Sequence, residues 1–370
     1  MKNAMLFSCC ISGMAMLPGQ ASAQQYTFVS IDVQCSATAD ASECPAGLAP
    51  SQVAAQTSAK GINARGDVVG VYVAGGKQRG FLLTDGEYTS LEFPLPGVRA
   101  TVANGINAHG EIVGQYTLPV HDPNNPPPED SPLYCPSAAD PACIKGFHYW
   151  RGQFTTVVFP STVDENGQTH AHPGAIAQRI TDDGAIYGCV HDHDLGQSMF
   201  GAVWARSGAS SLMFSGGELS DPMAVPMSMN NGGTPGNGKT LVGFFMDMSN
   251  RQHGYVVRDR MLEPYDPTPA TTLTAIWDVN PGQQFVGTFR ESGEVAAKRH
   301  AFLQSPDGSL PITFDFTCQE PTGCAGAPTG TVAFATVAFG VNSDAVIVGQ
   351  YQLMNGGAPH GFVAIPADAN

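Results

Sequence analysis

The chain has 370 residues and a formal net charge of −15, from 17 basic and 32 acidic side chains. This acidity argues against nucleic acid and anionic membrane surfaces as partners, because both attract basic patches. Charged residues make up only 13% of the chain, beside 43 glycines and 28 prolines, which favours short strands and turns over long amphipathic helices.

The N-terminus has the pattern of an export signal. Residues 1–23 contain one early lysine, an apolar run from Ala4 to Leu17 and the small residues Ala21-Ser22-Ala23. This pattern is typical of a secretory signal that is cleaved after the small residues. The apolar run is too short to remain as a membrane span. We therefore expect a secreted or periplasmic protein without a transmembrane segment.

A twelve-residue motif then recurs along the chain. "GINARGDVVGVY" begins at Gly61, and "GINAHGEIVGQY" begins at Gly105, 44 positions later. Weaker copies begin at Arg179, Ser228, Asp278 and Gly340, which makes six copies. A period of this length is typical of stacked or radial repeat architectures.

Each copy continues in the same order, which predicts four strands per unit, named a to d. Strand a ends at "GIN", strand b is "VVGVY", strand c is "GFLL" and strand d is an alternating run such as "YTSLEFP" from Tyr88. Alternation of this length is typical of a half-buried strand. Four antiparallel strands repeated radially form a β-propeller blade.

The sixth copy lacks strand d, and the chain's other end supplies a replacement. "QYTFVSIDV" from Gln25 is similar to "EYTSLEFP" from Glu87. An N-terminal strand that completes the last blade would close the ring and remove free edges. We therefore predict an all-β, six-bladed β-propeller in one domain, residues 24–370. An open β-solenoid is the less favoured alternative.

The repeat resembles the HAF repeat of extracellular bacterial proteins. "RHAFLQSPDG" at Arg299–Gly308 carries the tripeptide that names that repeat, and the two "GIN" segments quoted above carry its other half. At strand c the other copies depart from the tripeptide, with "RGF", "KGF", "FGA", "HGY" and "HGF". The resemblance implies export and a repeated β fold, and it implies no catalytic residues.

Seven cysteines follow the signal segment. Six lie in local pairs within polar stretches, which in an oxidising compartment predicts disulfides. The predicted pairs are Cys35–Cys44, Cys135–Cys143 and Cys318–Cys324, and Cys189 is left as a free thiol. Free buried thiols throughout are the alternative. No C-x2-C spacing is present to indicate a zinc ribbon.

Several positions recur in nearly every unit and are interpreted as structural. The asparagines of "GIN" are predicted turn residues with positive φ, at Asn63, Asn107, Asn230, Asn280 and Asn342. One strand-c position is basic and is interpreted as a packing or hydrogen-bonding device, at Arg79, Lys145, His253, His300 and His360. The aromatic residues two positions later are predicted core, at Phe81, Phe147, Tyr255, Phe302 and Phe362.

The long connections should mark the working face. They all fall between strands d and a or between b and c, at residues 35–57, 118–144, 161–174, 191–198 and 317–335. In antiparallel units these connections emerge at one end of the ring. Loops of this length are uncommon unless they are functional. The alternative is that the disulfide loops only cover the mouth of the ring.

A histidine cluster falls on the same predicted face. Pairing outward from a turn at Asp182-Asp183 places Gln178 opposite Tyr187 and Ile176 opposite Cys189. Further from the turn, it places Gly174 opposite His191 and His172 opposite His193. His170, Asp192 and Asp194 are adjacent in the sequence. Imidazoles suit zinc or copper, so a divalent metal site is one interpretation of these six residues, and a solvated polar loop is the other.

Two charged residues stand at the start of motif copies, where the other copies mostly hold Gly or Ser. Arg179 and Asp278 should lie near the ring axis. They could bind a polar ligand, or they could form an internal ion pair, which is the favoured interpretation.

Three functions remain open on the sequence. The leading hypothesis is an exported binding module whose partner is a small molecule, a glycan or a protein, with a monomeric state expected. The alternative is a metal-dependent hydrolase, lyase or oxidase that uses the histidine cluster. A structural protein of the cell envelope is the third.

Overall fold

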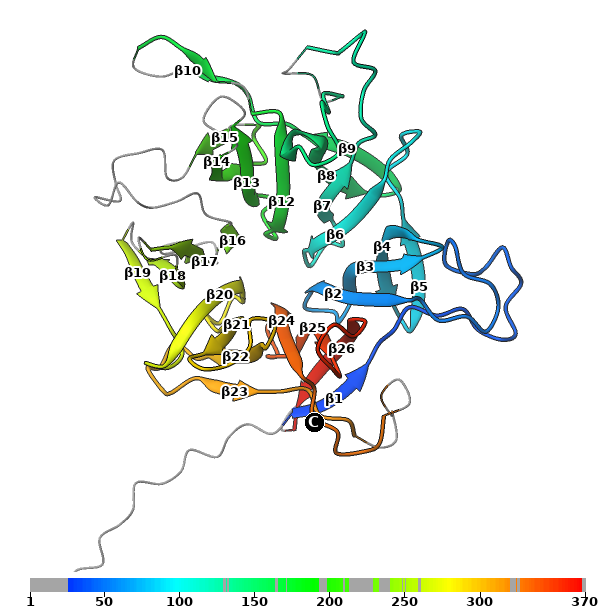
Figure 1. Ribbon diagram of the computed structural model, residues 1–370, viewed down its shortest axis with the longest axis vertical. Helices are drawn as coiled ribbons and strands as arrows, with labels where there is room; N and C mark the ends of the chain where they lie inside the picture. Colours follow the sequence, from blue (N-terminus) through cyan, green and yellow to red (C-terminus); the bar gives the residue numbers. More distant parts are fainter. Residues whose placement is uncertain are drawn as a thin grey trace, which may run out of the picture.

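The structure is a computed structural model in which the strands are arranged around a common centre (Figure 1). It describes residues 26–367, except 129–130, 132, 164–165, 171, 193–197, 209, 213–228, 233–239, 248, 250, 259–260, 320–323 and 325–326. The proposed signal segment, residues 1–23, lies outside the described residues. Among the described elements, the only helix is the short 3-10 turn η1 (Pro141–Cys143).

The strands follow the predicted a to d order in each repeat unit. Unit one contains β2 (Gln56–Ile62), β3 (Val68–Ala74), β4 (Lys77–Thr84) and β5 (Glu87–Leu91). Unit two contains β6 (Ala100–Ile106), β7 (Ile112–Thr117), β8 (Ile144–Trp150) and β9 (Gln153–Val157). Unit three contains β12 (Gly174–Ile180), β13 (Ile186–Asp192), β14 (Ser198–Trp204) and β15 (Ser210–Leu212), preceded by a ribbon of β10 (Thr162–Val163) and β11 (Thr169–His170).

The second half repeats the arrangement. Unit four contains β16 (Met229–Gly232), β17 (Leu241–Met246), β18 (Gln252–Arg258) and β19 (Met261–Tyr265). Unit five contains β20 (Thr271–Val279), β21 (Phe285–Glu291), β22 (His300–Gln304) and β23 (Ile312–Phe314). Unit six contains β24 (Ala335–Val341), β25 (Ile347–Gln352) and β26 (His360–Pro366).

The N-terminal strand pairs with the last strand of the chain, as predicted. β1 (Tyr26–Ser30) is antiparallel to β26, with Tyr26 opposite Pro366 and Ser30 opposite Phe362. The sheet order is therefore β1-β26-β25-β24, and β1 takes the place of strand d in unit six.

Strand a is innermost in the units (Figure 1), and in five of the six units it is bulged one residue before its motif copy begins. The register shifts at Lys60, Asn104, Gln178, Trp277 and Phe339. A bulge leaves one residue outside the regular ladder and bends the strand. The bulge in unit three also corrects the predicted pairing. Arg179 rather than Gln178 is opposite Tyr187, while Ile176 still pairs with Cys189 and Gly174 with His191.

The glycine of "VVG" on strand b leaves room for the aromatic ring of "GF" on strand c. In unit six Gly349 is directly opposite Phe362 in the pairing of β25 with β26. A Cβ atom at Gly349 would lie 2.0 Å from the Val337 carbonyl oxygen and 2.7 Å from the Phe362 ring. The Phe362 side chain therefore packs directly on the backbone of Gly349, which has no side chain of its own. The predicted core aromatics of strand c are fully buried, at Phe81, Phe147, Tyr255, Phe302 and Phe362.

The motif asparagines connect neighbouring units. Asn63 donates its amide to the Asn107 carbonyl at 3.1 Å, and Asn107 does the same to Thr181 at 3.1 Å. Asn280 donates to Asn342 at 2.8 Å, and Asn342 to Asn63 at 3.3 Å. Each carbonyl in this series belongs to the next unit.

The predicted backbone role of these asparagines was wrong for the four whose conformation is described. Positive φ falls three residues later, at Gly66, Gly110, Gln283 and Ala345. The asparagine side chain instead closes the turn. In unit six, Asn342 Oδ1 accepts the backbone N–H groups of Asp344 and Val346, each at 3.0 Å. The side chain of Asn230 lies outside the described part of the structure.

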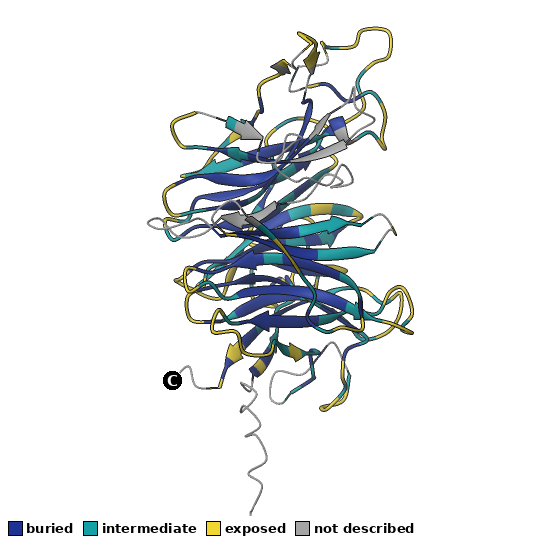
Figure 2. Ribbon diagram, turned by 90° about the vertical axis from the view of Figure 1, so that its left-hand side faces the viewer, coloured by how far each residue is buried: buried dark blue, intermediate teal, exposed yellow. Residues whose placement is uncertain are grey.

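The core lies within and between the units, and the exposed segments are turns and loops (Figure 2). The three predicted disulfides are present, at Cys35–Cys44, Cys135–Cys143 and Cys318–Cys324. Cys189 is free and buried, and burial raises the pKa of its thiol to about 12.

Candidate functional site

Arg179 occupies the centre of the ring and contacts four units. Its Nη1 donates to the carbonyl oxygens of Asn104 at 2.5 Å and Gln178 at 2.8 Å. Its Nη2 donates to the carbonyls of Lys60, at 3.0 Å, and Phe339. All four carbonyls belong to the bulged residues of strand a, whose bulges turn these groups out of the regular ladder.

Asp278 supplies the opposite charge from unit five. Its Oδ1 lies 3.2 Å from Arg179 Nε, and both side chains are buried, with exposed fractions of 6% and 7%. The other oxygen, Oδ2, accepts the Val341 backbone N–H at 3.1 Å. The structure therefore brings the two predicted residues together as an internal ion pair. The hydrogen bonds of both terminal nitrogens and the contact with Asp278 support the ion-pair interpretation. Ligand binding by these two residues stays a prediction.

A small pocket lies on the axis at the end of the ring that carries the a–b turns. Its volume is about 120 Å³, and its lining includes Ile62, Asn63, Asn107, Asn280 and Asn342, with the Arg179–Asp278 pair among the lining residues. This end is opposite to the one where the b–c and d–a loops emerge. Ligand pockets for small molecules are usually about 300–1,000 Å³, so this space is small for an organic ligand.

Lys60 is a central residue that the sequence interpretation missed. Its Nζ lies 3.3 Å from the centroid of the Phe339 ring, a cation–π contact between units one and six. Burial and the nearby charge of Arg179 lower the pKa of Lys60 to about 7. Lys60 directly precedes the "GIN" segment of unit one, but the bulge that places it on the axis could not be read from the sequence.

The basic strand-c residues form ion pairs near the end of strand d, as expected for a structural role. His360 Nδ1 lies 2.8 Å from Asp32, and His253 Nδ1 lies 2.8 Å from Asp266. Arg79 Nε donates to Glu92 at 2.8 Å. Unit two has Val158 at the acidic position, and Lys145 instead donates to the Pro173 carbonyl at 2.5 Å.

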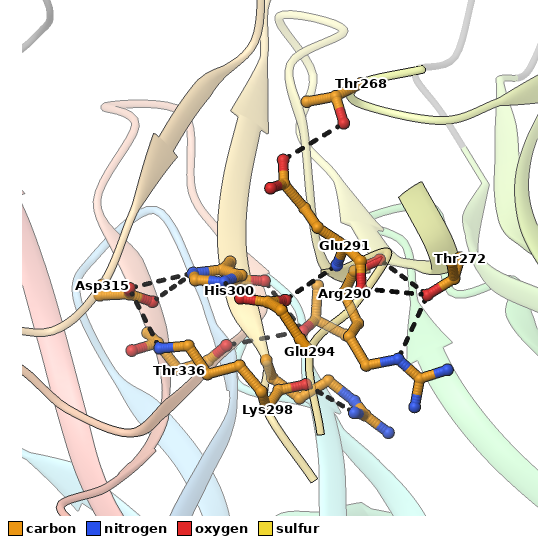
Figure 3. A network of polar contacts seen from close by, with 11 residues as sticks. Thr268, Thr272, Arg290, Glu291, Glu294, Lys298, His300, Asp315 and Thr336 are labelled. Atoms are coloured by element: carbon orange, nitrogen blue, oxygen red, sulfur yellow. Dashed lines mark hydrogen bonds and ion pairs between the residues drawn. The ribbon is translucent and has the colours of Figure 1, made fainter. Parts of the chain in front are cut away.

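The corresponding pair in unit five belongs to a larger network (Figure 3). His300 lies between two carboxylates, with Nδ1 3.0 Å from Asp315 and Nε2 2.8 Å from Glu294. Hydrogen bonding to Asp315 is the main cause that raises the pKa of His300, and Glu294 adds to it. These contacts hold strand c to strand d and to the b–c loop.

The predicted histidine corner is only partly described. His170 pairs with Thr162 in the separate β10–β11 ribbon, and His191 is opposite Gly174 in unit three. His172 is buried, with its ring edge-on to Phe159 at 5.4 Å. The residues His193 and Asp194, and the side chains of His170, His191 and Asp192, lie outside what the structure describes.

Metal binding therefore stays a prediction. Among the described residues, no group of three His, Cys, Asp or Glu side chains is arranged to hold a metal ion. The metal-dependent enzyme would depend on the part of the corner that is not described. Elemental analysis of the purified protein by mass spectrometry is the direct test, and a stoichiometric zinc or copper content is the result that would favour it.

The first disulfide loop forms a large pocket against unit one. The loop around Cys35–Cys44 runs outward beside β4 and β5 (Figure 1). It is anchored to unit one by Ala46, whose N–H donates to Ser90 Oγ at 2.7 Å and whose carbonyl accepts the Tyr72 hydroxyl at 2.8 Å. The loop pocket has a volume of about 800 Å³. Its lining includes Ser36, Glu43, Ser51, Glu87 and Tyr88.

The position of this loop refines the working-face prediction. The loop leaves unit six at the end where strands d and a connect, but it extends along the outer edge of unit one to Gly86 in the c–d turn. The pocket is therefore at the rim of the ring rather than over its axis. Glu43 and Glu87 are both exposed acids, so the lining is polar and negatively charged.

Comparison with known proteins shows the fold. No protein-family model and no curated protein sequence matches the chain. A Trypanosoma rangeli sialidase, solved in complex with sialic acid, is similar with a TM-score of 0.50 at 10% identity. The similarity covers 93% of this chain, which spans 59% of the sialidase chain. The chain is therefore a β-propeller by structural similarity.

Two further solved structures are also similar. One is the β-propeller domain of the trilobed protease from Pyrococcus furiosus, at 8% identity and a TM-score of 0.38. The other is an Aleuria aurantia lectin in complex with Fucα1-6GlcNAc, at 12% identity and a TM-score of 0.33. The similarities cover 83% and 84% of this chain, and 95% and 96% of those chains.

Among the described residues, no helix is long and apolar enough to cross a membrane.

Proposed function

We propose that this protein is an exported, six-bladed β-propeller that binds a ligand or partner through its disulfide-closed loops. The observation that carries the proposal is the loop pocket, which a disulfide-closed insertion forms against the regular repeat. Function in a repeat scaffold usually lies where the repeat is broken. The three disulfides support export, because such bonds persist in oxidising compartments.

Three kinds of contact support a closed ring of six blades. The motif asparagines connect unit five to six, six to one, one to two, and two to three. Single parallel bridges join strand c of one unit to strand a of the next, at Gln78–Ala100, Gln252–Leu273 and Arg299–Ala335. Strand β1 completes unit six. The HAF-repeat membership remains a proposal that rests on the sequence motifs alone.

The charge of the loop pocket favours a cationic group on the ligand. Glu43 and Glu87 contribute two carboxylates to the lining, whereas no Lys or Arg belongs to it. The chain as a whole carries a net charge of −15, which attracts cations over a distance and raises their association rate. A polyamine, or a protein segment rich in lysine, has the chemistry that this pocket would accept.

The test is calorimetric titration of the exported chain with spermine and with a trilysine peptide. We expect the double variant Glu43→Gln with Glu87→Gln to bind both probes about tenfold more weakly, because it loses two partly solvated charge contacts. The matched control is Glu263→Gln, since Glu263 is an acid on β19 whose side chain is 60% exposed. Equal affinity of the double variant and the wild type, or no binding by the wild type, would contradict the proposal.

A further inference from the structure

A third pocket lies between units two and three, at the end of the units that carries the a–b and c–d turns. Its volume is about 320 Å³, and its side-chain lining includes Glu111, His148, Trp150, Ile186, Trp204 and Arg206. We call it the Glu111 pocket. Glu111 directly precedes strand b of unit two, while Trp150 and Trp204 end strand c in units two and three. The size falls in the range of small-molecule sites, about 300–1,000 Å³.

Glu111 organises the polar side of this pocket. Its side chain is only 7% exposed, and its Oε2 lies 2.9 Å from His148 Nε2. Its Oε1 accepts a hydrogen bond from Arg206 Nη2. Burial alone would raise the pKa of Glu111, but the hydrogen bonds from Arg206 and His148 keep it below its ordinary value. The carboxylate is therefore charged, and it fixes an imidazole and a guanidinium in the wall.

Both partners of Glu111 remain accessible to a ligand. The His148 side chain is 27% exposed and the Arg206 side chain is 61% exposed. Glu111 engages only one terminal nitrogen of the guanidinium among the described contacts, and a guanidinium carries five N–H donors. The pocket therefore offers hydrogen-bond donors to a ligand, beside a carboxylate that accepts.

The same position in unit one shows that this arrangement departs from the repeat. Asp67 aligns with Glu111 in the motif, seven residues into "GINARGD" and "GINAHGE". Asp67 accepts hydrogen bonds from Asn63, Arg65 and Thr84, all within its own unit. Glu111 has one more methylene and reaches Arg206 of the next unit. The repeat scaffold does not need this inter-unit contact to build a blade.

Two of the three tryptophans in the chain form the apolar side of the pocket. Trp204 is held in place, because its Nε1 donates to the Val158 carbonyl at 3.0 Å and its ring is edge-on to Phe159 at 5.7 Å. Flat aromatic surfaces next to a few fixed polar groups are typical of small-molecule binding sites.

We propose that the Glu111 pocket binds one saccharide unit. A sugar ring presents apolar C–H faces to aromatic walls, and its hydroxyls both accept from guanidinium or imidazole N–H groups and donate to a carboxylate. A purely apolar ligand would desolvate three polar side chains without replacing their hydrogen bonds. A bare anion would meet the charge of Glu111 and leave the tryptophans without a contact.

Intrinsic tryptophan fluorescence gives a direct readout. The chain without its signal segment is titrated with galactose, N-acetylglucosamine and glucuronate, and with acetate as an anion alone. We expect a saturable change with at least one sugar and none with acetate. Trp150→Leu and Arg206→Gln should each weaken binding about tenfold, the size expected for losing one main contact.

The third tryptophan provides the matched control. Trp277 contacts Phe244 and Phe339 near the axis and is not part of the pocket lining. Trp277→Phe should therefore keep both the affinity and the response. Arg206→Gln changes an exposed side chain, so its thermal melting should match that of the wild type. The proposal is overturned if no sugar gives a saturable change, if acetate reproduces the change, or if Trp277→Phe weakens binding equally.

Discussion

At the scale of single residues, the molecule uses the same position for different chemistry in different units. The basic strand-c position is Arg79 in unit one, Lys145 in unit two and histidine in units four, five and six. Where an acid stands at or just beyond the end of strand d, the basic residue pairs with it. The histidine units therefore have an ion pair that depends on pH, because histidine is the side chain whose ordinary pKa lies near neutral pH.

We predict that the His360–Asp32 pair stabilises the protein in mild acid and less so in base. The hydrogen bond that His360 donates to Asp32 raises the pKa of His360 above its ordinary value of 6.5, although burial opposes this. A group with a raised folded-state pKa contributes its stability below 6.5 and loses it as pH rises through the folded value. Asp32→Asn should therefore lower the melting temperature near pH 6 and have a smaller effect near pH 9.

Circular dichroism melts across this pH range check the prediction. Asp85→Asn is the control, because Asp85 is an exposed residue in a turn with a φ of 50°, which asparagine also tolerates. A destabilisation by Asp32→Asn that is the same at both pH values would show that the carboxylate acts through packing rather than through the imidazolium.

At the scale of elements, strand β1 determines whether unit six is complete. Five residue pairs join it to β26. Phe28 packs on Phe316 at 5.3 Å and on Phe362 at 6.2 Å. The Phe28 backbone N–H also donates to Gln319 Oε1 at 2.9 Å, near the third disulfide. The strand therefore connects the start of the chain to both unit five and unit six.

Deleting residues 24–33 should cost several kcal/mol of unfolding free energy, since paired backbone groups and buried aromatic side chains are lost together. The comparison is the chain that lacks only the signal segment, residues 1–23. Urea unfolding measures the difference, and size-exclusion chromatography should show association through the exposed edge of β26. A monomeric deletion variant of unchanged stability would be inconsistent with closure by β1.

At the scale of the whole molecule, Arg179 is the single side chain that joins the most units at the axis among those described. It connects carbonyl groups of units one, two, three and six to the carboxylate of Asp278 in unit five. The bulges of strand a make those carbonyls available together. The packing of the units around this centre and the burial of the guanidinium therefore depend on each other.

Arg179→Ala should destabilise the protein by about 3–5 kcal/mol, because it leaves Asp278 as an uncompensated buried charge. Arg179→Lys should recover only part of this loss, since an ammonium has three donors in place of five. Arg258→Ala is the control, as Arg258 is an exposed arginine whose contact with Glu263 spans 3.7 Å, and it should change stability by under about 0.5 kcal/mol. Urea unfolding of the three variants distinguishes this role from a ligand site, whose loss would leave stability nearly unchanged.

The sequence by itself determined the strand order, the disulfides and the partner of β1. These features are local or periodic. The "GIN" and "GF" segments recur in the same order in successive repeat units. The paired cysteines are six to nine residues apart. A segment similar to the missing last strand is present at the N-terminus. Alternation and turn residues carry such information without any knowledge of distant contacts.

Only the tertiary structure decided which side chains meet across units. The ligands of Arg179 are backbone carbonyls, which have no sequence signature, and they become available through bulges that the pattern did not predict. The hydrogen bond between Glu111 and Arg206 joins residues that are 95 positions apart in the sequence, and it depends on how two units pack. The loop pocket likewise exists because the first disulfide loop folds back along unit one. These contacts are set by how the units pack against one another, and no local pattern in the sequence encodes that packing.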